Sequence, residues 1–396
     1  MGRFAGTGLA LAAAFILTTE AAQAAKCGGD FNRWLEEFKR EAAAEGISPR
    51  IISQSLNGVT YNPKAVQLDR AQRVFSQSFL QFSDRMVAQY RLTKGKQLIK
   101  KYGSIFSRVE QQYGVPAPII VGFWGLETDF GAFMGDMSTI RSLATMAFDC
   151  RRPEKFRPQL IAALKIIERG DLHPKQMIGP WAGELGQTQF LPTVYLTDAV
   201  DFDGDGRRDL MKSVPDVLAS TGKHLMNLGW RRGEPWLQEV RVPSNMPWEQ
   251  ANLATQHPVS QWSQWGVQPA QGRLASGGLQ ASLILPMGRN GPAFLAYPNF
   301  RVYLEWNQSL VYATTAAYYA TRLAGAPKVS RGKSEVAVLS YQQIKALQQK
   351  LVKRGYDVGK VDGIIGEKTR AAVRDVQKKM GLPADSYPTA GLLNKL

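Results

Sequence analysis

The feature that most constrains the fold is an apolar stretch at residues 116–135, PAPIIVGFWGLETDFGAFMG. Its first half offers almost no polar face to a helix, and a helix that is apolar all round is usually buried in a core. Pro116 and Pro118 favour a helix start there, and Gly131 favours a helix stop. The sequence therefore predicts a buried central helix around which the rest of the chain is packed.

Glu127 is the one long ionisable side chain in the buried part of this predicted helix. Apolar neighbours disfavour a carboxylate, and so does the negative C-terminal end of the helix dipole. Both effects should raise the pKa of Glu127. A carboxylic acid that stays protonated near neutral pH is suited to general acid catalysis. The alternative is a structural glutamate that caps the helix or pairs with an arginine.

Residues 1–25 have the pattern of a secretory signal peptide. Arg3 supplies a positive start, LALAAAFIL supplies an apolar run too short to span a bilayer, and Ala22–Gln23–Ala24 offers a small-x-small cleavage site. A lipid anchor on Cys27 is the alternative, but Lys26 stands where a lipoprotein signal requires a small residue. We therefore expect an exported protein with its signal peptide removed.

Two cysteines and two arginines mark positions near the start and in the middle of the chain. In an exported protein, two cysteines favour one disulfide, here between Cys27 and Cys150, over two free thiols. Arg151 and Arg152 follow the second cysteine directly. In a loop fixed by a disulfide they could hold a carboxylate or an acetamido group of a substrate, although a solvated pair is an equal alternative.

The charge of the chain indicates an acidic polymer as partner. The formal net charge is +16, from 49 Lys and Arg against 33 Asp and Glu. Cell-wall carboxylates and phosphates suit an exported protein of this charge, since a basic surface attracts anionic polymers. No nucleic-acid-binding motif is seen, so a nucleic-acid partner would rest on charge alone. A basic surface with no specific partner remains the alternative.

Residues 178–195, IGPWAGELGQTQFLPTVY, combine glycines, aromatic rings and amides. Gln187 and Gln189 can each donate and accept hydrogen bonds, which suits sugar hydroxyls and acetamides. Tyr195 could stack on a sugar face. A turn that packs on the core, with its amides bonded to backbone groups, is the alternative.

Residues 201–212, DFDGDGRRDLMK, form an acidic loop with the spacing of an EF-hand. Position 12 of that motif should be a bidentate acid, but here it is Lys212, whose charge opposes a cation. We therefore predict no bound metal and an Asx-turn loop, with a weak calcium site as the alternative. The matching positions 1, 3, 5, 6 and 9 are Asp201, Asp203, Asp205, Gly206 and Asp209.

The remaining pattern is mainly helical and predicts a chain of several parts. Residues 231–301 alternate in short runs, which indicates a small strand-rich insertion. Residues 327–338 are polar and basic and are typical of a linker. Residues 339–396 predict three short helices joined by Gly-rich turns. Asn307, at the start of a further helix, suits a helix cap or a sugar ligand.

Several ordered strings resemble the membrane-bound lytic murein transglycosylase B type of bacterial enzyme. They are GLETDFG, CRRPEKF, WAGELGQTQFLP, AVDFDGDGRRDL, NLGW and NFRVYLEWNQS, within a similarity that runs from about residue 31 to 325. The tail, with LQQKLVKRGY and VDGIIGEKT, is similar to a three-helix peptidoglycan-binding module. The resemblance implies a lysozyme-like catalytic domain at residues 26–326 and a binding domain at 339–396.

The resemblance also implies an activity and the residues that perform it. The expected reaction cleaves the β-1,4 bond between N-acetylmuramic acid and N-acetylglucosamine, and the muramic C6 hydroxyl closes onto C1 to leave a 1,6-anhydro end. Glu127 matches the single catalytic acid and base. Gln189 and Asn307 match sugar-binding positions, and Arg151 and Arg152 match a pair near the glycan.

Two residues depart from the family pattern, and they keep alternatives open. Glu184 stands where some members have a small residue, and a second carboxylate could support plain hydrolysis, as in two-carboxylate glycosidases, or hold a loop. Trp306 stands where a tyrosine is often found. The alternatives are a muramidase that uses water and a catalytically silent scaffold. We expect a periplasmic enzyme with peptidoglycan as partner, no cofactor and no nucleic acid.

Overall fold

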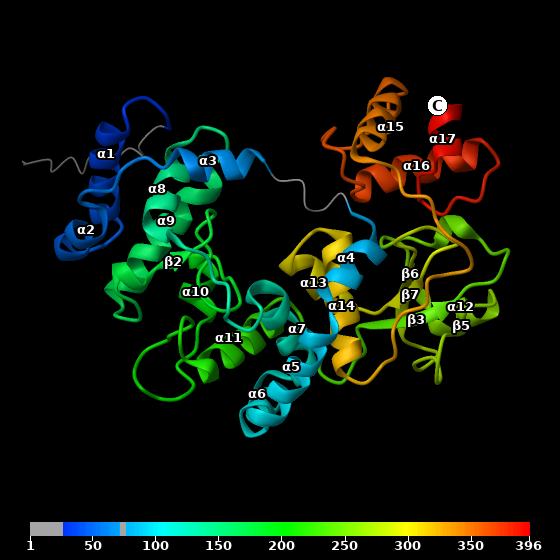
Figure 1. Cartoon of the computed structure of the whole chain (residues 1–396), viewed down its shortest axis with the longest axis horizontal. Coiled ribbons are helices and arrows are strands. Elements are labelled where there is room, and N and C mark those ends of the chain that lie inside the picture. The colour runs from blue at the N-terminus through cyan, green and yellow to red at the C-terminus, as the bar shows by residue number, and fades with distance from the viewer. Residues whose placement is uncertain (1–26, 72–76) are drawn as a thin grey trace, which may run out of the picture.

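A computed structural model describes residues 27–71 and 77–396 of the chain; the predicted signal peptide lies outside these residues. The described chain is mainly helical, with a five-stranded sheet on one side (Figure 1) and a second sheet of only two strands among the helices. Its first helices are α1 (Phe31–Ala44), α2 (Pro49–Leu56), α3 (Pro63–Arg70), α4 (Phe79–Met86), α5 (Gln89–Lys101), α6 (Gly103–Tyr113), α7 (Ala117–Thr128), α8 (Thr139–Phe148) and α9 (Pro153–Glu168).

The second half of the chain adds further helices and most of the strands. The helices are α10 (Pro192–Asp198), α11 (Val214–Asn227), α12 (Val259–Gln264), α13 (Phe300–Trp306), α14 (Leu310–Leu323), α15 (Tyr341–Lys353), α16 (Glu367–Lys379) and α17 (Ala390–Lys395), with single 3₁₀ turns at Pro174–Gln176 and Trp248–Gln250. The strands are β1 (Met137–Ser138), β2 (Ile178–Gly179), β3 (Leu237–Arg241), β4 (His257–Pro258), β5 (Gln268–Pro269), β6 (Gln280–Ile284) and β7 (Ala293–Ala296).

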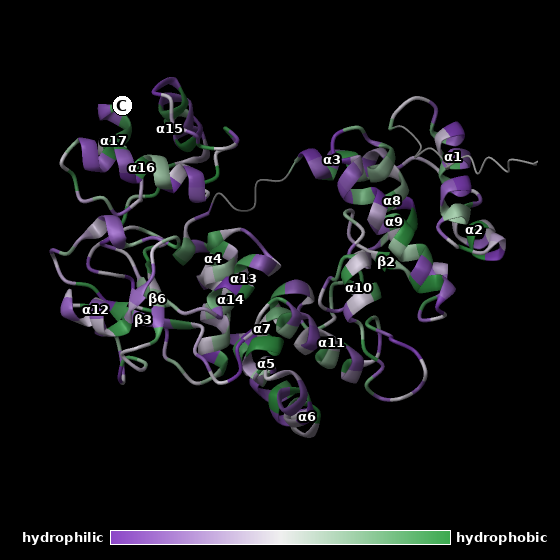
Figure 2. Ribbon diagram, turned by 180° about the vertical axis from the view of Figure 1, so that it is seen from behind, coloured by the Kyte–Doolittle hydropathy of each residue, from purple (hydrophilic) through white to green (hydrophobic). Residues whose placement is uncertain are grey.

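Helix α7 is the predicted central helix, and it is buried on almost every side. It packs against α14 and α5, and it is among the segments coloured as hydrophobic in Figure 2. The helix ends at Thr128, before the predicted stop at Gly131, because Asp129 and Phe130 already have left-handed backbone conformations. Gly131 is still required, because a Cβ there would lie 2.5 Å from the side-chain oxygen of Gln187.

The strand-rich insertion forms an antiparallel sheet of five strands in the order β4-β6-β7-β3-β5. In its centre, β7 pairs with β6 on one side and with β3 on the other, in the register Leu237↔Ala296. The insertion has a small core of its own, with Trp262 fully buried. The mainly α fold with a small strand-rich insertion is therefore confirmed.

Helices α15, α16 and α17 pack on one another around their own small core. This unit is docked on the insertion, which the sequence did not predict. The buried guanidinium of Arg370 donates to the carbonyl oxygens of Leu285 and Pro286, at 3.3 and 2.8 Å. The Arg289 amide donates to Asp385 at 3.0 Å. These contacts leave the C-terminal unit fixed against the insertion.

The segment between α14 and α15, predicted as a linker, lies along the body of the protein. Val329 is buried in the main core. The Lys333 amide donates to the Asn290 carbonyl at 2.7 Å. Lys328 and Arg331 both pair with Asp84 at 3.1 Å. The segment therefore has no helix or strand but makes specific contacts along its length.

A disulfide between Cys27 and Cys150 joins the start of the described chain to the loop after α8. The two residues are 123 positions apart in sequence. The Gly28 amide also donates to the Phe148 carbonyl at 2.9 Å. Among residues 27–71 and 77–396, no helix is both long and apolar enough to cross a membrane.

Candidate active site

Glu127 lies in the last turn of α7, and its carboxyl group is held by two donors from another part of the chain. The indole Nε1 of Trp306 donates to Glu127 Oε1 at 2.9 Å, and the hydroxyl of Tyr312 donates to the same oxygen. Trp306 ends α13, and Tyr312 lies in the first turn of α14. Both donors bond to Oε1, so the second oxygen, Oε2, is left to carry a proton.

The environment raises the pKa of Glu127 from an ordinary 4.5 to about 7. Burial is the largest cause, because an apolar surrounding disfavours the charged form. The hydrogen bonds from Tyr312 and Trp306 act against it, and the nearby negative charge of Glu184 adds to it. Burial and the charge of Glu127 likewise raise the pKa of Tyr312 well above 10, so Tyr312 is a permanent donor.

A stack of rings fixes Trp306, and through it Glu127. Trp306 stacks on Phe123 of α7 with ring centroids 4.1 Å apart, and it meets Phe190 edge-on at 5.8 Å. His224 of α11 lies 5.4 Å from Trp306. The His224 imidazole bonds to Asp198 through Nδ1 at 2.6 Å, and burial lowers its pKa. The indole N–H is thereby aimed at the carboxyl group of Glu127.

The loop at residues 178–190 brings amide groups to the same region. The backbone amide of Leu185 donates to the Phe190 carbonyl at 2.8 Å, and the amide of Phe190 donates to the Leu185 carbonyl at 2.9 Å. This pair of bonds closes a tight turn. Gln189 lies within that turn at a left-handed φ of 54°. Its Nε2 donates to the Gly186 carbonyl at 2.8 Å, and its side chain is partly exposed. Gln189 is therefore held in place with its amide oxygen left to accept.

Two residues of this region that the sequence predicted to bind sugar have structural roles instead. The Gln187 amide accepts from Trp124 Nε1 at 2.9 Å and donates to the Met211 carbonyl at 3.1 Å, so both of its ends are used. Tyr195 has no exposed surface, and its hydroxyl bonds to the backbone of Arg208 and Leu210. The side-chain amide of Gln187 and the ring of Tyr195 are therefore not open to a ligand. This corrects the prediction that these two residues bind sugar.

Arg151 and Arg152 both bond to the carboxylate of Asp69, in the last turn of α3. The Asp69 side chain has no exposed surface, whereas the two arginine side chains are 41% and 30% exposed. One buried negative charge thus positions two partly exposed positive ones. The remaining N–H groups of the arginines can meet an anionic or amide group.

Asn307 lies at the junction of α13 and α14, next to both donors to Glu127. Its Oδ1 accepts from the Ser309 amide at 3.0 Å, and Ser309 in turn caps α14. The side chain is partly exposed, so its NH₂ group is free to bind a ligand. Asn307 therefore serves the helix junction and still offers a donor beside the site.

Glu184 is a second carboxyl group close enough to Glu127 to affect its pKa. Burial raises the pKa of Glu184, and the positive charges of Lys155 and Arg152 act against that effect. Its Oε2 atom is buried, and it has no hydrogen-bond partner in the described part of the chain.

The acidic loop satisfies its own carboxylates, as predicted for an Asx-turn loop. Asp201 accepts from the amides of Gly204 and Gly206 at 2.7 and 2.9 Å, and Asp203 accepts from Ser213 Oγ at 2.6 Å. Oxygens of Asp201, Asp203 and Asp205 do lie within 4.8 Å of one another. This donor set suits a hard cation but lacks the bidentate acid of the full motif.

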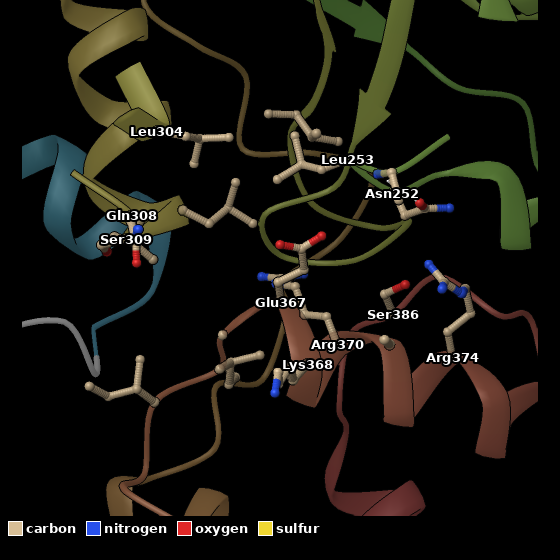
Figure 3. Close-up of a pocket in the computed structure, with 18 of the residues that line it drawn as sticks. Asn252, Leu253, Leu304, Gln308, Ser309, Glu367, Lys368, Arg370, Arg374 and Ser386 are labelled. Atoms are coloured by element: carbon tan, nitrogen blue, oxygen red, sulfur yellow. Dashed lines mark hydrogen bonds between the residues drawn. The ribbon is translucent and has the colours of Figure 1, made fainter. Parts of the chain in front are cut away.

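A cavity of about 670 Å³ lies where the C-terminal unit meets the main body (Figure 3). Gln308 and Ser309, which directly follow Asn307, line one side, and Glu367 and Arg370 of α16 line the other. The cavity therefore runs from the docked C-terminal unit to the helix junction beside the Glu127 site.

Sequence reasoning missed the two donors to Glu127 and the partner of the arginines. Tyr312 lies 185 residues from Glu127, and Asp69 lies 82 residues from Arg151. For Trp306 the sequence did offer a signal, because this residue stands where the family resemblance leads one to expect a tyrosine.

Comparisons with known proteins agree with this geometry. Residues 30–321 match the family described as Transglycosylase SLT domain, and residues 340–396 match the Putative peptidoglycan binding domain. The membrane-bound lytic murein transglycosylase B of Escherichia coli (strain K12) is 31% identical over 240 residues, which cover 60% of this chain and 64% of that relative.

The chain is also similar to solved structures of lytic transglycosylases. SltB3 from Pseudomonas aeruginosa, in complex with NAG-anhNAM-pentapeptide, is 41% identical with a TM-score of 0.86, covering 93% of this chain and 99% of that one. The Escherichia coli lytic transglycosylase Slt35, in complex with calcium, is 27% identical with a TM-score of 0.64, covering 76% and 96%. The chain belongs to the transglycosylase SLT domain family, a family of lytic transglycosylases.

Proposed function

We propose that this protein cleaves the β-1,4 bond between N-acetylmuramic acid and N-acetylglucosamine in peptidoglycan and leaves a 1,6-anhydro end. The observation that carries the proposal is the single carboxyl group of Glu127, whose pKa of about 7 suits both donation and recovery of a proton. The SltB3 complex with NAG-anhNAM-pentapeptide, a 1,6-anhydro compound, supports it.

Glu127 performs both proton transfers in this reaction. With Oε1 held by Trp306 and Tyr312, the proton on Oε2 passes to the oxygen of the leaving N-acetylglucosamine as its bond to C1 breaks. The carboxylate then accepts the proton of the muramic C6 hydroxyl as that oxygen bonds to C1. Glu127 gives up one proton and takes one back, so the reaction needs no second general base.

The polar groups around Glu127 position the glycan. Gln189 and Asn307 each keep part of an amide free, and they lie on the two segments that frame Glu127. Arg151 and Arg152 present partly exposed guanidinium groups, which suit a lactyl or peptide carboxylate. We assign these four residues to substrate binding.

The C-terminal unit retains the enzyme on the cell wall. It matches a putative peptidoglycan-binding family, and residues 330–396 carry 13 Lys and Arg against 6 Asp and Glu. A basic surface favours an acidic polymer. Because the substrate lies outside the inner membrane, we place the protein in the periplasm, with residues 1–25 acting as the export signal.

Product analysis tests the reaction. Purified sacculi are digested, and the released muropeptides are separated and weighed by mass spectrometry. A transglycosylase gives 1,6-anhydromuramic ends, which are one water lighter than the reducing ends of a muramidase. Reducing ends would overturn the proposal in favour of hydrolysis with Glu184 as second carboxylate. Absence of soluble products from a folded protein would indicate a binding scaffold.

A further inference from the structure

One oxygen of the Glu184 carboxyl group, Oε2, lacks a hydrogen-bond partner within the described chain, although the carboxyl group does accept from the backbone amide of Glu184 itself. Its Oε2 atom is shielded from solvent, yet it accepts no hydrogen bond. Leaving such a group unpaired costs free energy, because it has lost its water and gained nothing in return. An unpaired buried acceptor beside Glu127 therefore indicates a donor that arrives with the substrate.

Glu184 is not needed to hold its own loop. The turn is closed by the two backbone bonds between Leu185 and Phe190. The turn is anchored to α7 by Thr128, whose hydroxyl donates to the backbone carbonyl of Gln187. It is anchored to the chain before α11 by the backbone amide of Gln187, which donates to the Leu210 carbonyl at 2.9 Å. None of these contacts uses the carboxyl group of Glu184.

Burial raises the pKa of Glu184, and two positive charges close to it act against that rise. These charges belong to Arg152 and Lys155 at the start of α9, and the Glu184 carboxyl group is also close enough to Glu127 to raise the pKa of that residue. Glu184 therefore offers an acceptor that two cations help to keep charged, close to the acid that protonates the leaving oxygen.

The chemistry of the muramic residue limits which donor can meet an acceptor here. Its C3 oxygen carries the lactyl ether, and its C4 and C1 oxygens are glycosidic, so none of them has a hydrogen. The C6 hydroxyl must face Glu127, to which it gives its proton. The one donor left on this sugar is the N–H of the C2 acetamido group.

We propose that Glu184 accepts a hydrogen bond from the acetamido N–H of the muramic residue whose bond is cleaved. This inference rests on the proposed function and names the group that its substrate presents. The bond orients the acetamido carbonyl oxygen toward C1, as in glycosidases that use substrate assistance.

The proposed step balances as follows. The acetamido oxygen bonds to C1 as the bond from C1 to the leaving oxygen breaks and Glu127 protonates that oxygen. The resulting oxazolinium carries one positive charge, shared by its N–H, which faces the Glu184 carboxylate. The C6 oxygen then bonds to C1, the acetamido group is released, and the C6 proton returns to Glu127.

Glu184→Gln tests the inference, because it keeps size and an acceptor but removes the charge. A charge-assisted hydrogen bond is roughly twice as strong as a neutral one, so kcat should fall about tenfold. KM should change less than about twofold, since the charge that Glu184 meets develops only in the transition state. The products should keep their 1,6-anhydro ends. Glu154→Gln, which changes an exposed acid in the first turn of α9, is the matched control and should change neither constant.

A muramic acid thiazoline, in which the acetamido group is closed onto C1 through sulfur, gives a second measurement. Its Ki should rise about tenfold in Glu184→Gln, in step with kcat, because the ring nitrogen of the thiazoline, when protonated, carries the N–H that takes the place of the oxazolinium N–H. Full activity of Glu184→Gln, or a fall in kcat with an unchanged Ki, overturns the inference. If Glu184→Gln does not fold, Glu184→Asp, which keeps the charge on a shorter arm, is measured in both assays.

Two other outcomes are separable. Anhydro products with an unaffected Glu184→Gln refute the role of Glu184 and leave the proposed function standing. Reducing-end products from the wild type refute the proposed function itself. Glycan strands freed of stem peptide should show the same tenfold loss. If the loss disappears on these strands, the donor is a peptide amide and the assignment to the acetamido group is wrong.

Discussion

Replacing Glu127 by glutamine should stabilise the folded protein at high pH while it removes activity. The amide oxygen can still accept from Trp306 and Tyr312, so the ring stack is kept. What the substitution removes is a carboxyl group whose pKa is raised from 4.5 to about 7 in the folded protein. Because an amide cannot donate and recover the proton, activity should fall by about 10²–10⁴ or more.

The pH dependence of this stabilisation follows from proton linkage. In the unfolded chain the Glu127 carboxyl group loses its proton near pH 4.5, whereas in the folded protein it keeps it up to about pH 7. The folded state thus binds more protons between these values, and the stability of the wild type falls across that range. At about 1.4 kcal/mol per pKa unit, the full penalty above pH 7 is about 3 kcal/mol.

The assay compares thermal unfolding of wild type and Glu127→Gln at pH 4.5 and pH 8.5. The two melting temperatures should agree at the lower pH, and the variant should melt on the order of 4 °C higher at the upper one. Glu154→Gln, an exposed glutamate, should show no such divergence. Equal melting temperatures at both values would refute the argument that burial raises the pKa of Glu127. Substantial turnover by the variant would refute its catalytic role.

Four further outcomes are expected. Replacing Cys27 and Cys150 together by serine should lower the free energy of unfolding by roughly 4–5 kcal/mol in the chain-entropy description, measured by denaturant titration, and an unchanged midpoint would contradict it. Asp69→Asn should cost about 1.5–3 kcal/mol in the same titration, because it removes the charged acceptor of the arginine hydrogen bonds but leaves guanidinium groups that stay partly exposed to water. EDTA should leave both activity and melting temperature unchanged, and recovery of a lost activity by calcium would show that the acidic loop holds a required ion. Arg370→Ala should release the C-terminal unit from the insertion. The release should be seen as faster proteolysis between α14 and α15 and as weaker sedimentation with sacculi, while the folded catalytic domain still cleaves. An unchanged digestion pattern would contradict the docking role of Arg370.

The central helix and its acid could be predicted from the sequence because their causes are local. The apolar run predicts that the helix is buried. The single glutamate near the end of that run is then the residue whose pKa burial must raise. The same local signals identified the strand-rich insertion and the three C-terminal helices. Glycines that must adopt left-handed conformations, such as Gly131, were also visible as helix stops, although the helix ended slightly earlier.

What could not be predicted depends on contacts between distant segments. The Tyr312 hydroxyl is indistinguishable in sequence from the other tyrosines of α14, and only the packing of α14 on α7 brings it to Glu127. Gln187 and Tyr195 carry the right groups for sugar binding, but the fold buries them. Composition alone does not tell a buried amide from an exposed one, so polar residues in a turn were assigned to the substrate too freely.

The way in which Glu127 is held explains how one carboxyl group can serve two opposite steps. Burial by α7 favours the neutral acid, and the two donors on Oε1 favour the carboxylate, so the pKa comes to rest near neutrality rather than far above it. An acid at that value gives up its proton to the leaving oxygen and still takes one back from the C6 hydroxyl. Loss of the donors alone would raise the pKa further and make the first transfer harder. The helix and the two donors, which lie 179 and 185 residues from Glu127 in sequence, therefore act together as one acid–base site.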